Sequence, residues 1–454
     1  MRPTWLRYAI LTLLAWGFMP EIRRLYDFKT PLFQPVEILS IVPIAMLVPF
    51  VWYAIRGGWD RAAPLTRTFA SIWLAAYAYG FVIGIVNGAP PPAAIYEFAN
   101  TCLPVGMGIW FANELRADDG AYRKIVATLL AIGTLASAYA LVQFIAPPPW
   151  DAMWVYASGF LAAGLPYPYT LRAWGTMNSP GPFADFLVCT ILFALPLVNW
   201  RKPVALVATL VCCLGLALTF VRVNSLVLGA CLAIFLVLSP RRTELGIAIS
   251  GILLAIALVL GLAPSIAGET GSRITDRLFD RFNSIDAIDT DVSVVTRQLE
   301  IEAGLSLAIS EPLGQGLGTI GTAAKLDGGA GEAITVDSGY VSRFEVLGYL
   351  GMLGYVIVTI GGLARSLLRA VAVASRGQRE RAVVVVVVAA VAAQAALVAI
   401  DFAVDSHSAF DGILFWLALA TAFGYREPQN ATESESVAPR SLREPTIGRE
   451  LSAQ

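Results

Sequence analysis

The chain has 454 residues, of which 57% are apolar and only 14% are charged, and its mean hydropathy is +0.67. Soluble proteins carry about a quarter charged residues, so this composition excludes soluble enzyme folds and indicates an integral membrane protein. A net charge of −1 gives no basic excess for nucleic acid. The single histidine and the five cysteines, all in apolar runs, are too few for a zinc site and do not suggest disulfides.

Apolar segments recur along the whole chain. A helix needs about 20 mostly apolar residues to cross the hydrocarbon core, and on this criterion the sequence predicts an all-α polytopic protein with about 12 spans. The seventh and eighth spans are separated because Arg222 and Asn224 interrupt a long apolar run, and an arginine at the bilayer centre is costly. In chain order the predicted spans cover residues 5–19, 37–55, 67–87, 93–112, 124–145, 181–199, 204–220, 224–239, 244–263, 338–361, 382–400 and 409–424.

The basic residues predict the orientation, because lysine and arginine collect on the cytoplasmic side of a membrane. With a cytoplasmic N-terminus, about 21 of the 32 basic residues fall inside. Arg23, Arg24 and Lys29, after the first span, break this pattern. Both termini are expected in the cytoplasm, and the first span is expected to stay as an anchor because Phe18-Met19-Pro20 is a poor cleavage site.

Three segments outside the spans stand out. Residues 146–180 are rich in proline and aromatic residues, which suits an interfacial segment. Residues 264–337 form a large, partly helical periplasmic loop before the tenth span, and its glycines from Gly314 to Gly331 suggest a mobile lid. Residues 1–426 are thus a transmembrane domain, and the polar residues 427–454 are a disordered cytoplasmic tail.

Four arginines lie near predicted membrane boundaries on the outer side: Arg172, Arg222, Arg297 and Arg343. Guanidinium groups match phosphate oxygens bidentately, so near a bilayer they suit lipid headgroups or a lipid-linked diphosphate. The alternative is ordinary pairing with nearby acids: Asp337 or Glu345 for Arg343, and Glu300 or Glu302 for Arg297. Arg222 has no nearby acid in sequence.

Several acids and the one histidine could take part in chemistry. Asp337 suits either a helix N-cap or a general base at the membrane surface. His407 suits either a hydrogen-bonded loop residue or a proton relay. Glu97 and Asp185 are acids inside spans, where a carboxylate needs a partner or a function. Asp289-Thr290-Asp291 has a metal-binding spacing, but an acidic loop explains it better. No segment predicts a bound metal or cofactor.

Three segments in order resemble motifs of the O-antigen ligase and polymerase superfamily. Residues 171–184 (LRAWGTMNSPGPFA) resemble its arginine, glycine-threonine, asparagine-x-proline motif. Residues 218–224 (LTFVRVN) resemble its threonine-x-serine-arginine turn, with Val221 in place of serine. Arg297 and the PLGQG of residues 312–316 resemble its arginine-started helix and the following proline-leucine-glycine-x-glycine. At the end of the large loop, Asp337-Ser338 replaces the ligases' histidine-asparagine, which fits a polymerase better than a lipopolysaccharide ligase.

The resemblance implies a metal-independent glycosyltransferase of the bacterial inner membrane with its active site facing the periplasm. Its donor would be an undecaprenyl-diphosphate-linked glycan, its acceptor a glycan or a lipid-linked sugar hydroxyl, and other polysaccharide assembly proteins would be its partners. Arg172 and Arg222 would hold the diphosphate and Asp337 would accept the hydroxyl proton. The remaining expected substrate-binding residues are Arg297, Tyr340, Arg343, Asn178 and Asp185.

Two other functions remain open from the sequence. A transporter of lipid-linked oligosaccharide or polysaccharide predicts functional charges in the span centres, of which Glu97 is the best example. A purely structural assembly partner predicts that no single charge matters. The enzyme predicts that the charges gather at one face of the membrane.

Overall fold

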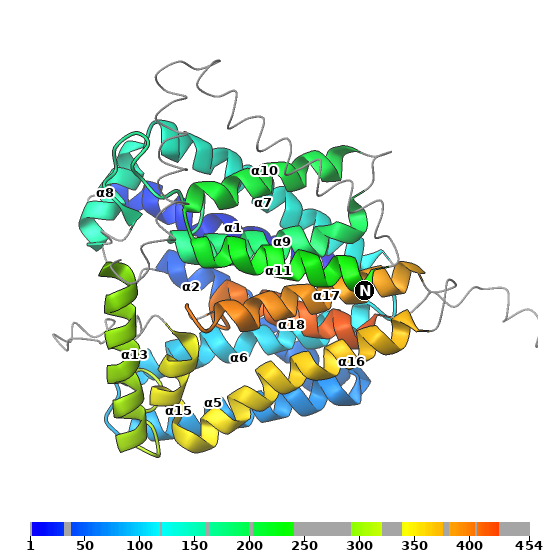
Figure 1. The fold of residues 1–454 in the computed structure, drawn as a ribbon. Helices are drawn as coiled ribbons and strands as arrows, with labels where there is room; N and C mark the ends of the chain where they lie inside the picture. Colours follow the sequence, from blue (N-terminus) through cyan, green and yellow to red (C-terminus); the bar gives the residue numbers. More distant parts are fainter. Residues whose placement is uncertain are drawn as a thin grey trace, which may run out of the picture.

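The computed structural model describes residues 2–30, 38–118, 120–159, 163–198, 203–239, 292–319, 338–375, 381–404 and 406–425. Throughout these ranges helix is the only regular secondary structure, and most helices run along one common direction to form a bundle (Figure 1). The predicted all-α architecture is therefore confirmed for the described part of the chain. The predicted ninth span, the Asp289–Asp291 motif, Asp337 and the tail from residue 427 lie outside these ranges.

The described residues form a series of helices of very different lengths. The N-terminal half contains α1 (Arg2–Lys29), α2 (Ile38–Ala45), α3 (Val48–Tyr53), the π-helical η1 (Ala54–Gly58), α4 (Trp59–Arg61), α5 (Pro64–Val86), α6 (Pro91–Glu114), α7 (Ala121–Ile145) and α8 (Pro149–Ser158). After α8 follow α9 (Pro180–Ala194), η3 (Leu195–Leu197), α10 (Pro203–Thr219), α11 (Arg222–Leu238), α13 (Val292–Ser310), α15 (Gly339–Val356), η6 (Ile357–Gly361), α16 (Gly362–Ala374), α17 (Arg381–Ile400) and α18 (Ala409–Gly424).

Length and apolar composition indicate a polytopic membrane protein. Within the described ranges, six helical segments are long and apolar enough to cross a bilayer: Leu39–Arg61, Pro64–Val86, Ala121–Ile145, Pro180–Leu197, Gly339–Ala374 and Ala382–Ile400. The shorter helices α10, α11 and α18 are also apolar. The total of about 12 spans stays a prediction.

The centre of the bundle is formed by α17 and α18. Of the apolar stretch Ala382–Ile400, 89% is buried, and α18 is buried from Phe410 to Gly424. A helix that is apolar on every face is expected to be surrounded by other helices. Accordingly α17 packs against α9, α11, α16 and α18, and α18 packs closely against α6. This central pair fixes the positions of the loops that precede and follow it.

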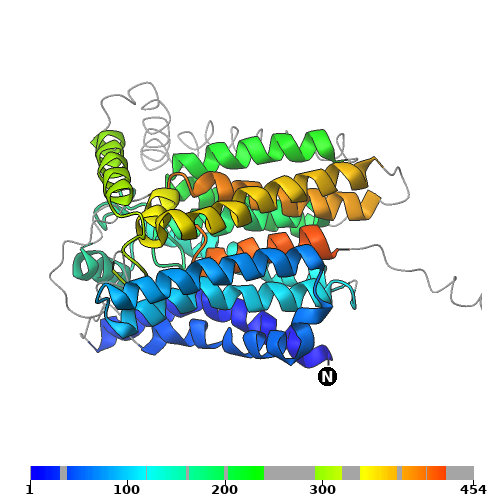
Figure 2. The same ribbon diagram turned by 90° about the horizontal axis from the view of Figure 1, so that it is seen from below.

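One end of the bundle carries additional structure. Helix α8 lies there, and α13 runs across the same end instead of along the bundle in both views (Figures 1 and 2). The last residues of α5, α7, α10 and α17 and the first residues of α6, α9, α11, α15 and α18 meet at this end (Figure 1). We call it the α8 end, and it contains most of the residues that the sequence singled out.

Candidate functional site

Arg172 lies against the turn between α10 and α11. Its backbone N–H donates to Ala163 O (2.8 Å), and the next N–H, from Ala173, donates to Leu218 O (3.0 Å). The Arg172 side chain, which is partly exposed, donates from Nε to Thr219 O (3.2 Å). The first two motifs of the sequence therefore meet in space.

The α10–α11 turn begins where the sequence predicted a break. Phe220 has a left-handed φ of 54°, and α11 begins at Arg222, so the division of the long apolar run into two helices is confirmed. Val221 N–H donates to Thr219 Oγ1 (3.2 Å), which closes the turn. A cation is unfavourable at the positive end of a helix dipole, whereas an anion there is stabilised by both the dipole and the guanidinium. Arg222 thus sits where an anion would be favoured.

Asp185 of α9 binds the helix that follows this turn. Asn224 Nδ2 donates to Asp185 Oδ1 (2.5 Å), and both side chains are fully buried. Because Asn224 lies two residues after Arg222, this bond ties the first turn of α11 to α9. The sequence led us to expect Asp185 in contact with substrate, and the structure places its side chain completely buried against Asn224.

Residues 172–179, which we call the arginine loop, are held by a buried ionic network. Arg24 is completely buried and pairs through Nε with Asp151 Oδ1 (2.8 Å) of α8. Arg24 also pairs with Glu21, and it donates to two carbonyls of the arginine loop, Met177 O and Gly175 O, the latter at 2.9 Å. One guanidinium therefore joins α1, α8 and the arginine loop.

Gln143 of α7 completes this network. Its Nε2 donates to Asp151 Oδ2 (2.9 Å) and to Gly175 O (3.0 Å), while its Oε1 accepts from Gly175 N (2.8 Å) and Trp174 N (3.2 Å). Tyr139 OH also donates to Asp151 Oδ2 (2.7 Å). The backbone at Gly175 is thus paired on both sides by one amide side chain. This network fixes the loop that carries Arg172 and the exposed Asn178.

The loop between α17 and α18 joins the arginine loop to the start of α15. Gly181, at the start of α9, approaches Val404, for a Cβ added there would be 3.8 Å from Val404 Cγ1. On its other side, Phe402 stacks on Tyr340 with ring centroids 4.4 Å apart. Asp401 O accepts from Gly339 N (2.9 Å). The helix that follows Asp337 is therefore anchored next to the arginine loop.

His407 lies inside this same loop and is almost fully buried. Its Nδ1 is 3.2 Å from Asp401 Oδ1 and 3.1 Å from Tyr355 OH, and Tyr355 OH donates to Asp401 Oδ2 (2.6 Å). Its ring also packs edge-on against Phe415, with centroids 4.6 Å apart. The interpretation of His407 as a hydrogen-bonded loop residue is confirmed, and a relay function stays a prediction.

Arg343 is paired with the acid of α6 that the sequence left without a partner. Arg343 Nη1 donates to Glu97 Oε1 (2.9 Å), and Arg343 is only 3% exposed. Glu97 Oε2 accepts from Gly318 N (2.7 Å). Glu97 was not among the acids considered from the sequence as partners of Arg343, of which Asp337 lies outside the described residues. Because the guanidinium is buried and paired, Arg343 holds α15 to α6, and direct binding of substrate is not supported.

Residues 311–319, which we call the glycine loop, are pinned between three helices. Gln315 N donates to Glu345 O (2.8 Å) and Gly316 N to Val346 O (2.9 Å) of α15, where that helix is interrupted at Gly348 (φ 58°). On the other side, Leu317 N donates to Gly80 O (2.9 Å) of α5. The prediction of a mobile lid is therefore wrong for residues 314–318. These glycines serve close backbone approach, since a Cβ on Gly316 would be 1.9 Å from Gly84 N.

Asp337 was also considered as a helix N-cap, and this prediction is wrong by one residue. The N-cap of α15 is Ser338, whose backbone is extended and whose side chain is 4% exposed. Asp337 itself lies outside the described residues, as does the side chain of Arg297 in α13. The described neighbours of Asp337 nevertheless lie at the α8 end, beside Asp401 and Phe402.

The residues that the sequence failed to identify are those of the ionic network, Arg24, Gln143 and Asp151. One signal was present, since Arg23 and Arg24 break the positive-inside pattern. The structure gives the reason: Arg24 is internal, and Arg23 is nearly so, pairing with Asp27 (3.7 Å) and Ser40 (3.0 Å). The positive-inside rule does not apply well to basic residues that are buried in ion pairs, because their charge does not face the membrane surface.

The arrangement at the α8 end is suited to an anion. Arg172 and Arg222 are partly exposed and lie on segments that contact each other, and the buried Asn224–Asp185 bond holds the start of α11. Over the described ranges, no group of three His, Cys, Asp or Glu side chains is placed to hold a metal ion. No protein-family model matches the chain, and no curated protein matches it either.

Proposed function

We propose that this protein is a membrane glycosyltransferase of the kind that polymerises or transfers glycans carried on undecaprenyl diphosphate. The single observation that carries the proposal is the hydrogen bond from Arg172 Nε to Thr219 O, which brings Arg172 to the turn that begins α11 at Arg222. Two guanidinium groups on adjoining turns suit a diphosphate, whose two phosphoryl groups each carry charge.

The proposed reaction is the one that the resemblance to the O-antigen ligase and polymerase superfamily implies. A sugar hydroxyl of the acceptor attacks the anomeric carbon of the donor glycan, and a new glycosidic C–O bond forms. The bond from that carbon to the diphosphate oxygen breaks, and the lipid diphosphate leaves with the electron pair. Arg172 and Arg222 stabilise the developing negative charge. The hydroxyl proton passes to the carboxylate of Asp337, next to the described start of α15.

The other residues take supporting positions in this proposal. Asn178 is exposed on the arginine loop and suits contact with a sugar. Tyr340 is buried and stacks on Phe402, so it is proposed to pack beside Asp337. Arg297 is proposed to contact the acceptor from α13. Asp185 and Arg343 are positioning residues, because their side chains are buried. The α8 end is proposed to face the periplasm of a bacterial inner membrane, with both termini in the cytoplasm.

The structure also bears on the choice between an enzyme and a transporter. Glu97 was the charge that best supported transport, since an acid within a span is expected to act on cargo or ions. Its two carboxylate oxygens bind Arg343 and Gly318 N–H, which gives it a structural role. This observation favours the enzyme.

The test is incubation of the purified protein with a lipid-diphosphate-linked repeat unit, with products separated by size with and without added acceptor. A ladder from donor alone identifies a polymerase, and single transfer to added acceptor identifies a ligase. Arg172→Ala and Arg222→Ala are expected to lower the rate by about 10²–10³, the usual effect of removing one donor that stabilises developing charge. Arg365→Ala, an exposed arginine of α16, is the matched control. Intact donor under every condition contradicts the proposal and supports transport.

A further inference from the structure

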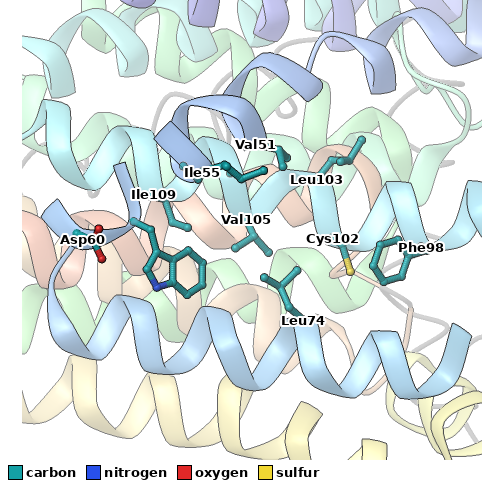
Figure 3. A pocket seen from close by; sticks show the side chains of 12 residues that line it. Val51, Ile55, Asp60, Leu74, Phe98, Cys102, Leu103, Val105 and Ile109 are labelled. Carbon is teal, nitrogen blue, oxygen red and sulfur yellow. The ribbon is translucent and has the colours of Figure 1, made fainter. Parts of the chain in front are cut away.

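A cavity of about 540 Å³ lies away from the α8 end, between three segments of the N-terminal half (Figure 3). Its walls are apolar: Val51 and Ile55 come from α3 and η1, Leu74 from α5, and Val105 and Ile109 from α6. The volume is in the range of sites that bind small ligands, about 300–1,000 Å³. We call this cavity the α3–α6 groove.

The length of the groove matches one leaflet of a bilayer. Along α6 it extends from Phe98 to Ile109, which is about 16 Å at the helical rise of about 1.5 Å per residue. Half of a hydrocarbon core of about 30 Å is nearly the same length. The groove also runs along α5 and α6 (Figure 3). These dimensions fit one acyl chain that lies along the bundle.

One end of the groove is charged and the other is not. Asp60, its only charged lining residue, lies at the end opposite Phe98 (Figure 3). Arg67 Nη1 is 4.0 Å from Asp60 Oδ1, so this acid already has a basic neighbour. Arg56 and Arg61 are exposed in the same turns and leave an excess of positive charge. Basic groups beside an apolar groove at a membrane boundary suit an anionic lipid headgroup.

Two glycines, Gly106 and Gly57, allow the backbone to form this groove. Gly106 lets α6 touch α3, since a Cβ there would be 2.8 Å from Val51 N. Gly57 has a φ of 94° and interrupts the helix after Arg56, which turns Trp59 and Asp60 across the end of the groove. The groove is therefore fixed by the fold and differs from an ordinary lipid-facing surface.

We propose that the α3–α6 groove binds one acyl chain of an anionic phospholipid, with its phosphate held by Arg56 and Arg61. The lipid belongs to the leaflet at the end opposite α8. Charge complementarity selects this occupant, because Arg56 and Arg61 attract an anionic headgroup and repel a cationic one, and their charge adds nothing to the binding of a neutral one. The proposal does not depend on the glycosyltransferase proposal, since the groove and the α8 end share no residue.

The experiment uses the full chain, purified and reconstituted in nanodiscs of phosphatidylglycerol and phosphatidylethanolamine, then released for native mass spectrometry. The wild type is expected to retain one phosphatidylglycerol. Val105→Phe and Leu74→Phe fill the groove from two walls and are expected to lower retention about tenfold, the loss of about 1.4 kcal/mol. Val82→Phe, at an exposed position of α5 that does not line the groove, is the matched control.

A second pair of variants tests the headgroup without changing the packing. Arg56→Gln with Arg61→Gln is expected to lower the preference for phosphatidylglycerol over phosphatidylethanolamine about fivefold for each arginine removed. Arg365→Gln should leave it unchanged. Retention that is equal in the groove variants and Val82→Phe overturns the proposal. So does equal retention of the two phospholipids by the wild type, or a retained mass that matches a polyprenyl lipid.

Discussion

The arginine loop and the glycine loop lie at the same end of the bundle, but different kinds of contact hold them in place. Side chains from α1, α7 and α8 hold the arginine loop, and the central one is the buried guanidinium of Arg24. The glycine loop is held through its backbone: its N–H groups donate to carbonyls of α5 and α15, and its carbonyls accept from Tyr79 and Asn87. A buried ionic network thus holds the loop that presents Arg172, whereas neutral hydrogen bonds to the backbone hold most of the glycine loop.

This comparison predicts that the arginine loop is most sensitive to loss of charge. Arg24→Ala leaves the buried Asp151 and the partly buried Glu21 without their cation, and breaking a buried pair costs about 3–5 kcal/mol. We expect a large fall in the unfolding temperature of the purified protein. Arg365→Ala is the exposed control, and an equal unfolding temperature for both variants would show that the network contributes little.

The glycine loop should instead be most sensitive to added volume. Gly316→Ala places a Cβ 1.9 Å from Gly84 N at a φ of 89°. Gly88→Ala is the matched control, because its φ of 83° is similar and nothing lies within 4 Å of its Cβ. We expect about 3 kcal/mol for Gly316→Ala and about 1 kcal/mol for Gly88→Ala, measured by chemical unfolding. Equal costs would mean that strain alone matters and that the close approach does not.

Glu97 is a charged side chain that binds the glycine loop and also pairs with Arg343. It therefore tests whether an ion pair contributes to the stability of this loop as well. Glu97→Gln keeps an acceptor for Gly318 N–H but removes the charge that Arg343 faces. We expect about 2 kcal/mol of destabilisation, most of it recovered when Arg343→Met is added, because the uncompensated charge is then gone. If the double variant is as unstable as the sum of the two single ones, the pair is not coupled.

The two loops also show what the sequence can predict. The break at Arg222 was predictable because a charge within an apolar run is costly, and the helices follow from apolar length alone. The partner of Arg24 was not predictable, because Asp151 lies 127 residues away and no periodicity relates them. The glycines were recognised but interpreted as flexibility, since a sequence does not show whether a second backbone occupies the space of the missing Cβ.

The smallest effect is expected at an exposed pair far from both loops. Lys124 and the N–H of Gly120 hold the pKa of Asp118 below its usual value. A lowered carboxyl pKa stabilises the fold above the unfolded-state value, and that stabilisation is lost as the pH falls through the folded-state pKa. Both side chains reach solvent, so Asp118→Asn should cost less than about 0.5 kcal/mol at neutral pH. Unfolding measured from pH 7 to pH 3 should show the variant and wild type converging, and a cost near that of Arg24→Ala would contradict the contrast between buried and exposed pairs.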